Sequence, residues 1–324
     1  MLPQNYNLKQ AGTQLEKLAT SRTEKGFTMN QLACFAEKLD WKNDSVDATQ
    51  TGTRECLTWR LTEINEEGVT EEIVFSVQGI IAQCDLPPIM RPFGKNTSAR
   101  NIQQRIIITG LDQPTFLQSI QGINRVNAML RKHIREETIP DVHTYVGDYH
   151  AIEISNRYFT SRRFAGNETH VPFSTDIDPK GHLEQMKTDN FIHSTENDVA
   201  YYERRHDTSG RTRHVEFDTI PPSRLRVGDI VEVQLTLAVV ETQGKGLGKR
   251  DNAGSHQYKT RLVLRGITLM DSRFSEESRV STITNKQAPA TLKRKVGYFA
   301  EEELETQEQL KRMAIDQQEG DDDD

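Results

Sequence analysis

The sequence lacks the long apolar runs that membrane proteins need. No stretch approaches the ~20 apolar residues of a spanning helix, and the opening residues, MLPQNYNLKQAGTQLEKL, contain no uninterrupted apolar segment of the kind that directs secretion. With 35% apolar and 27% charged residues, the chain of 324 residues is polar for its length. We therefore expect no membrane association and no secretion.

Cysteine is scarce and catalytic signatures are missing. Cys34, Cys56 and Cys84 form no CxxC pair, which argues against a structural zinc site and for a reducing compartment. The chain contains no GxSxG, HExxH or kinase motif. The glycines of GKGLGKR (244–250) precede a predicted strand instead of the helix that a dinucleotide-binding loop requires. We expect no cofactor and no metal, and the sequence favours a binding protein over an enzyme.

One enzyme alternative stays open at the histidines of a polar central region. His182, His193, His206 and His214 lie near several aspartates, and distant histidines can converge in a folded protein. Their spacing matches no standard metal-ligand pattern, which favours hydrogen-bonded or solvated loop histidines. A loop-assembled site at 182–214 is therefore kept as an alternative hypothesis.

The net charge of −7 is unevenly distributed along the chain. Residues 301–324 contain eleven acidic and two basic residues, a local charge of −9, so residues 1–300 carry +2. Acidic terminal runs are usually solvated and often serve as interaction tails. We expect residues 301–324 to form a disordered tail, with a short helix near its start around Leu304, Leu310 and Met313 as an alternative there, that solubilises the protein, binds protein partners, or competes with polyanions for a basic face.

Short alternations of apolar and polar residues dominate the pattern. They predict strands at 57–61 and 73–77 around a turn at 65–68, and an antiparallel hairpin formed by 230–239 and 258–269. Many short strands predict an α+β, β-rich fold, in which antiparallel strands form a barrel or sandwich with a few helices.

Helical spacing appears in two places. It runs through parts of the first forty residues, and again from Pro114 to about residue 134, where proline suits the first turn of a helix. We expect three regions: an N-terminal α+β region at 1–140, a β-rich region at 141–277, and a linker with the acidic tail at 278–324.

The predicted strand at 258–265 carries a stripe of cations. Alternation places Lys259, Arg261 and Arg265 on one face, and the preceding loop adds three more basic residues, Lys245, Lys249 and Arg250. Such a face could contact phosphates. Alternatively, Glu232 and Glu241 on the partner strand could neutralise it through cross-strand pairs.

The segment RYFTSRRF (157–164) interleaves cations and rings. Single-strand-binding proteins combine a positive groove with aromatic faces on which bases stack. The candidate residues are Arg157, Tyr158, Phe159, Arg162, Arg163 and Phe164. The alternative is that Phe159 and Phe164 belong to the core while the arginines point to solvent.

Three stretches carry a resemblance to a known group of proteins. They are DNFIHSTENDVAYYE (189–203), VGDIVEVQ (227–234) and LVLRGI (262–267). Together they resemble a multi-copy, uncharacterised family of mushroom-forming fungi over about residues 185–275. The resemblance implies a eukaryotic host and genes that travel with mobile elements, and it assigns no residue a role. The strand–loop–strand layout is also similar to part of an OB-fold, and the acidic tail to those of single-stranded-DNA-binding proteins.

These observations favour a non-enzymatic protein that binds single-stranded nucleic acid through a basic and aromatic β face. A protein–protein interaction or scaffold role is the alternative, and the histidine-based enzyme the second alternative. The basic cluster Lys293-Arg294-Lys295 predicts a nuclear location, because an import receptor could reach it in a linker.

Overall fold

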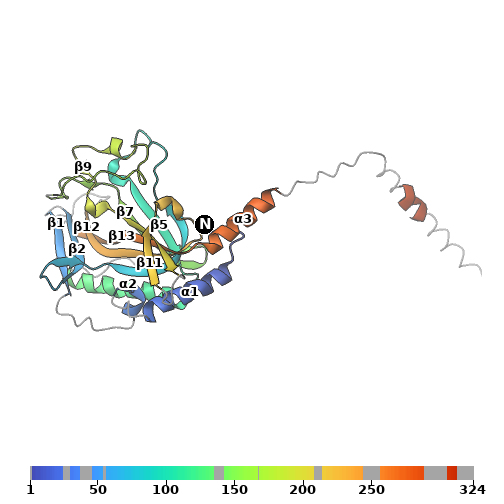
Figure 1. Ribbon diagram of the computed structural model, residues 1–324, viewed down its shortest axis with the longest axis horizontal. Helices are drawn as coiled ribbons and strands as arrows, with labels where there is room; N and C mark the ends of the chain where they lie inside the picture. The colour runs from blue at the N-terminus through green and yellow to red at the C-terminus, as the bar shows by residue number, and fades with distance from the viewer. Residues whose placement is uncertain are drawn as a thin grey trace, which may run out of the picture. The chain divides into compact units, whose positions relative to one another are not determined.

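The computed structural model describes residues 2–24, 30–36, 46–53, 56–134, 142–166, 168–207, 214–243, 256–287 and 305–311. Residues 1–281 form one compact unit and residues 282–324 a second (Figure 1). In the second unit the described residues are the end of a helix at 282–287 and a helical segment at 305–311.

Besides the helical segment at 305–311, the described ranges contain three α-helices and five short 3-10 helices. The α-helices are α1 (Leu8–Glu24), α2 (Pro114–His133) and α3 (Arg273–Gln287). The 3-10 helices are Leu32–Ala36, Ala99–Asn101, Glu184–Met186, Thr195–Asn197 and Pro222–Arg224. None of the helices in this part of the chain is long and apolar enough to cross a membrane.

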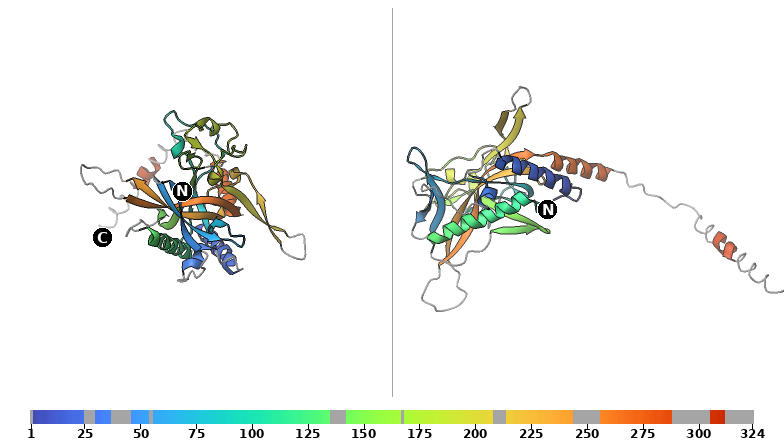
Figure 2. Two further views of the ribbon diagram at one scale, coloured as in Figure 1. Left: turned by 90° about the vertical axis from the view of Figure 1, so that its left-hand side faces the viewer. Right: turned by 90° about the horizontal axis from the view of Figure 1, so that it is seen from below.

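Eleven strands form one sheet and two more form a separate small pair. The sheet contains β1 (Val46–Thr53), β2 (Cys56–Ile64), β3 (Thr70–Glu72), β4 (Phe75–Asp85), β5 (Gln103–Thr109), β6 (His143–Val146), β7 (Tyr149–Arg157), β10 (Ala200–Asp207), β11 (His214–Thr219), β12 (Ile230–Gln243) and β13 (His256–Asp271). The pair is β8 (Thr160–Ser161) with β9 (Phe191–Ile192). The β10–β11 hairpin extends away from the rest of the sheet (Figure 2).

Five strands of the sheet close into a ring. β12 pairs with β4, β4 with β5, and β5 with β7, all antiparallel. β7 then pairs with β13 in parallel, and β13 returns to β12 as an antiparallel hairpin. The predicted β-rich α+β fold with a barrel or sandwich is therefore confirmed, as is the hairpin of 230–239 with 258–269.

Apolar residues of the ring strands and of α2 share one core. Ile106, Ile154, Val233 and Leu264 are fully buried there, and the stripe of α2 that begins at Phe116 packs against them. The predicted helix from Pro114 thus forms, with proline in its first turn. Gly122 lets α2 approach the 3-10 helix Leu32–Ala36, because a Cβ there would collide with the carbonyl oxygen of Leu32.

Some element predictions need correction. The turn at 65–68 forms, but β2 pairs across it with β3, while 75–77 begin β4, which leaves to join β12 and β5. The predicted linker at 278–300 starts as a helix, since α3 continues to Gln287. Strands from both sides of residue 141 share the ring, because β5 pairs with β7 and β4 with β12.

Candidate nucleic-acid interface

The outer face of β5, β7 and β13 is the surface that carries the predicted cations. Arg105 on β5 lies opposite Ser155 on β7, and Ser155 lies opposite Val263 on β13. Their neighbours Ile106, Ile154 and Leu264 point into the core. Alternation therefore directs one cationic set outward, namely Arg105, Arg157, Lys259, Arg261 and Arg265.

The burial along β13 confirms the predicted alternation. Thr260, Leu262 and Leu264 are buried, whereas Lys259 is exposed and Arg261 is partly buried. We call the outward cations of the three strands, Arg105, Arg157, Lys259 and Arg261, the ring face. Arg265 lies outside the ring face as defined, because Glu72 and Glu196 hold its guanidinium at a partly buried position.

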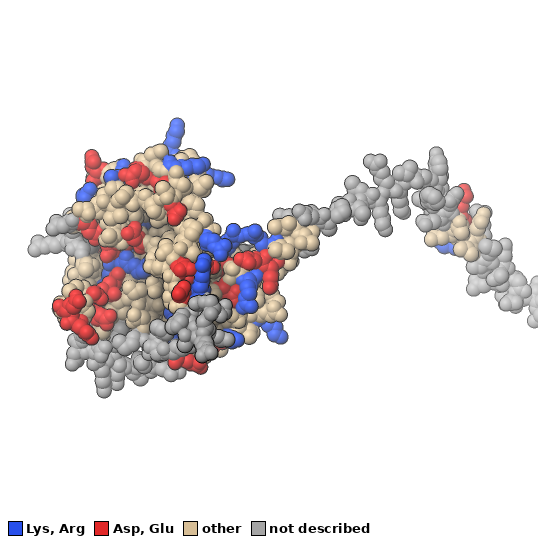
Figure 3. Space-filling view, in the orientation of Figure 1, with Lys and Arg blue, Asp and Glu red and all other residues tan. Residues whose placement is uncertain are grey.

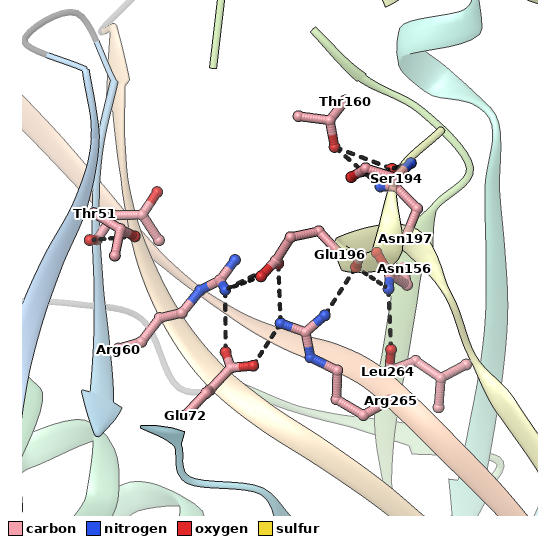
Figure 4. A network of polar contacts seen from close by, with 11 residues as sticks. Thr51, Arg60, Glu72, Asn156, Thr160, Ser194, Glu196, Asn197, Leu264 and Arg265 are labelled. Carbon is pink, nitrogen blue, oxygen red and sulfur yellow. Dashed lines mark hydrogen bonds and ion pairs between the residues drawn. The ribbon is translucent and has the colours of Figure 1, made fainter. Parts of the chain in front are cut away.

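Arg265 belongs to a network of four charged side chains (Figure 4). Its Nη2 lies 2.6 Å from Glu72 Oε2 and 3.1 Å from Glu196 Oε2. Arg60 Nη1 contacts the same two carboxylates at 3.2 and 3.0 Å. Burial alone would raise the pKa of Glu196, but the charges of Arg60 and Arg265 outweigh it and lower the pKa. The two arginines are thus balanced by two glutamates.

Glu232, which was expected to neutralise the cations of β13, does not pair with Arg265. That residue, 2% exposed, receives two 2.7 Å hydrogen bonds from the guanidinium of Arg22 and one of 2.6 Å from Gln78. A buried carboxylate needs such donors, so Glu232 is used to hold α1 to the sheet and does not face the stripe. The neutralising residues come instead from β3 and from Thr195–Asn197, far away in sequence.

The network also anchors the segment between β7 and β10 to the end of the ring. Arg265 Nη1 and Asn156 Nδ2 donate to the carbonyl oxygen of Glu196 at 2.8 and 3.0 Å (Figure 4). A capping box links Ser194 with Asn197, and Tyr201 donates to Gln104 at 2.6 Å. The position of residues 158–198 is therefore fixed by hydrogen bonds to the ring.

The predicted stacking role of Tyr158 and Phe159 is contradicted by their burial. Each is 1% exposed and packs in a small core with Ala99, Ile102 and Leu183. A base cannot stack on a ring that the protein itself covers. The physical reason is that the polar-looking region 158–198 contains apolar residues, including Phe173 and Met186, that form a small core together with residues from 89–102.

The rest of this segment stays at the surface. Arg162 and Arg163 are exposed, and the guanidinium of Arg163 lies 4.6 Å from the ring centre of the partly buried Phe164. Arg157 is partly buried at the end of β7. Basic side chains project from the top of the molecule in the view of Figure 3. For Phe159 the structure therefore supports the alternative, in which the ring belongs to the core and the neighbouring arginines point to solvent.

Three further groups of basic residues lie elsewhere in the chain. Lys245, Lys249 and Arg250 lie outside the described residues, as does Lys293-Arg294-Lys295. The connection of β4 to β5 carries exposed Arg91, Lys95 and Arg100, which the sequence analysis did not nominate. The signal for them was a basic loop that leads into a strand.

The histidines of the enzyme alternative occupy different elements. His193 is 2% exposed, its Nδ1 lies 2.8 Å from the carbonyl oxygen of Tyr158, and its Nε2 lies 3.2 Å from Asp198. Burial is the main cause that lowers its pKa. His206 and His214 belong to the β10–β11 hairpin. Within the described ranges, no three His, Cys, Asp or Glu side chains are grouped as metal ligands would be.

Comparisons with known proteins add little to this geometry. No protein-family model matches the chain, and no curated protein matches its sequence. One solved structure, of gp2.5, a single-stranded-DNA-binding protein encoded by bacteriophage T7, is similar at 12% identity. The match covers 61% of this chain and 91% of that protein, with a TM-score of 0.27. A similarity this low assigns no function, so the residues themselves must carry the functional argument.

Proposed function

We propose that this protein binds single-stranded nucleic acid on the ring face. The observation that carries the proposal is the outward direction of Arg105, Arg157, Lys259 and Arg261 on three neighbouring strands, on either side of the row formed by Arg105, Ser155 and Val263. A β-sheet face with several cations can follow the phosphates of an extended strand. A role in catalysis is not needed to explain any of these residues.

The position of this face within the ring supports the proposal. OB-folds are five-stranded Greek-key barrels that bind oligonucleotides on the face of their second and third strands, beside the first and last connecting loops. In chain order the ring strands are β4, β5, β7, β12 and β13, so β5 and β7 are the second and third. The corresponding loops contain two basic trios: Arg91, Lys95 and Arg100, and Lys245, Lys249 and Arg250.

Acidic residues on the ring face would make the binding moderate and sensitive to salt. Arg105 lies 2.5 Å from Asp85 and 3.7 Å from Glu153, and all three side chains are substantially exposed. Exposed ion pairs contribute little, about 0–1 kcal/mol, so a polyanion can compete for the cation. The proposed ligand is a strand long enough to make several phosphate contacts at once.

The test is fluorescence anisotropy of a labelled 20-nucleotide single strand across a salt series. Each phosphate contact contributes a log–log slope of about −0.7, so Lys259→Glu with Arg261→Glu should reduce the slope by about 1.4 and weaken binding at least tenfold at low salt. Lys9→Glu with Lys17→Glu, both exposed on α1, is the matched control and should change little. Absence of binding at low salt, or an equal loss in the control, would overturn the proposal.

A further inference from the structure

A second group of arginines lines a cleft away from the ring face. The cleft has a volume of about 330 Å³ and lies where the 3-10 helix Pro222–Arg224, the start of β12 and the start of α3 meet. Its basic lining residues are Arg224, Arg226 and Arg279. Figure 3 shows basic side chains gathered beside the base of α3, with acidic ones among them. Three guanidinium groups from two segments therefore share one concave surface.

These arginines differ from Arg60 and Arg265 in how they are paired. No ion pair within 4.0 Å joins Arg226 or Arg279 to an acidic side chain of the described ranges. Arg224, whose side chain is 50% exposed, has one contact of 3.4 Å with Glu203. The charge of Arg226 acts on the nearby Asp229, whose pKa it lowers against the larger effect of burial, but the two are not joined by an ion pair of 4.0 Å or less, so the guanidinium can still bind an anion from solution.

The acidic residues of the cleft are already engaged by the protein. Asp229, 1% exposed, accepts hydrogen bonds from the hydroxyl of Ser275 and, at 2.7 Å, from the backbone N–H of Arg226. Glu276 accepts one of 2.9 Å from Ser272. Asp229 therefore fixes the backbone that presents Arg226, and it links this backbone to the helix that presents Arg279.

We propose that this cleft binds a phosphate group through Arg224, Arg226 and Arg279. Arginine recognises phosphate through two parallel N–H···O bonds, and three such side chains can surround one group. The cleft is distinct from the ring face, because its lining residue Leu269 lies six residues along β13 from Val263, roughly 20 Å at ~3.3 Å per residue. The phosphate belongs either to a free ion or nucleotide, or to the end of a nucleic-acid strand.

The test uses the full chain and titration calorimetry with inorganic phosphate. Arg226→Ala with Arg279→Ala should lower the affinity at least tenfold. Arg273→Ala is the matched control, since Arg273 is on the same helix, is paired with Asp271 at 2.6 Å and does not line the cleft. Equal phosphate binding by the double variant and the unaltered protein would overturn the proposal, as would no detectable binding by the unaltered protein. If the double variant fails to fold, Arg279→Gln alone, at an exposed position, should still give a severalfold loss.

A second arm distinguishes the sources of the phosphate. Two single strands are compared by anisotropy, one with a 5′-phosphate and one with a 5′-hydroxyl. Tighter binding of the phosphorylated strand, lost in the double variant, assigns the cleft to a strand end. Equal binding of both strands, with phosphate binding retained, assigns it to a free ion or nucleotide. The ring-face variant Lys259→Glu with Arg261→Glu should leave phosphate binding unchanged, so failure of one proposal is separable from failure of the other.

Discussion

The end of the ring and the cleft beside α3 both contain arginines, but the fold uses them in opposite ways. At the ring end, Arg60 and Arg265 each contact Glu72 and Glu196, and the guanidinium groups hold elements together. In the cleft, Arg226 and Arg279 meet no described acidic side chain within ion-pair distance. An arginine held between partly buried carboxylates serves the fold, whereas an arginine whose ion pair is exposed, or that has no close carboxylate among the described residues, remains a candidate ligand for phosphate.

The largest expected effect is on stability, and it concerns the small core that contains Tyr158 and Phe159. Phe159→Ala should lower the free energy of unfolding by about 3–5 kcal/mol, because it empties a fully buried position. Phe164→Ala, at a partly buried position, should cost much less. Chemical denaturation of both variants measures the difference. Equal costs would contradict the distinction between a buried and a surface ring in this segment.

The free energy of unfolding, measured as a function of pH, should respond in opposite directions to Asp229 in the cleft and to Glu196 at the end of the ring. Burial raises the pKa of Asp229 to about 6 from its ordinary 3.8, a difference worth roughly 3 kcal/mol at most. The folded state binds this proton more tightly, so the stability that it contributes is complete below pH 3.8 and is lost as the pH rises through about 6. The lowered pKa of Glu196 acts oppositely, and its contribution is lost as the pH falls below about 4.5.

Substitutions make this contrast measurable. Asp229→Asn should flatten the loss of unfolding free energy between about pH 4 and 6, while Glu196→Gln should flatten the loss below pH 4.5. Urea denaturation at each pH gives both slopes. The account is wrong on this point if the two variants change the same part of the pH profile.

Removal of one carboxylate should affect the ring end more than the cleft. Glu196→Ala leaves Arg60 and Arg265 to share Glu72 in a partly buried site, and should cost about 1–2 kcal/mol. It should also strengthen the binding of a single strand, since two cations lose a competitor. Glu276→Ala, at an exposed position, should cost less than about 0.5 kcal/mol. Thermal unfolding and anisotropy check both results.

A smaller effect is expected for the exposed cations of the 157–164 segment. Arg163→Ala should leave stability nearly unchanged and reduce the salt slope of single-strand binding by about 0.7, the value of one phosphate contact. An unchanged slope would remove Arg163 from the interface.

The acidic tail is expected to make the smallest difference. We propose that residues 301–324 compete weakly with nucleic acid for the ring face, so their deletion should tighten single-strand binding a fewfold at low salt. Binding that stays the same after deletion would favour the solubilising role.

The proposed nuclear location is tested separately, by replacing Lys293, Arg294 and Lys295 with alanine in a tagged protein.

Sequence patterns within single segments predicted the helices and strands that those segments form. The alternation on β13, the hairpin with β12 and the helix from Pro114 follow from periodicities that each segment carries within itself. The neutralisation of Arg265 could not be predicted in this way, because Glu72 and Glu196 lie 193 and 69 residues away. Burial of Tyr158 also depends on distant partners such as Ala99 and Leu183.

Photocrosslinking of a single strand to the full chain, followed by mass spectrometry of the linked peptides, tests the central proposal most directly. The proposal predicts crosslinks to β5, β7 and the first half of β13, together with the 86–102 loop, and few or none to α1. An end-on contact in the cleft would add peptides around Arg226 and Arg279 only for a 5′-phosphorylated strand. Crosslinks confined to α1 or to the β10–β11 hairpin, with the ring face empty, would contradict it.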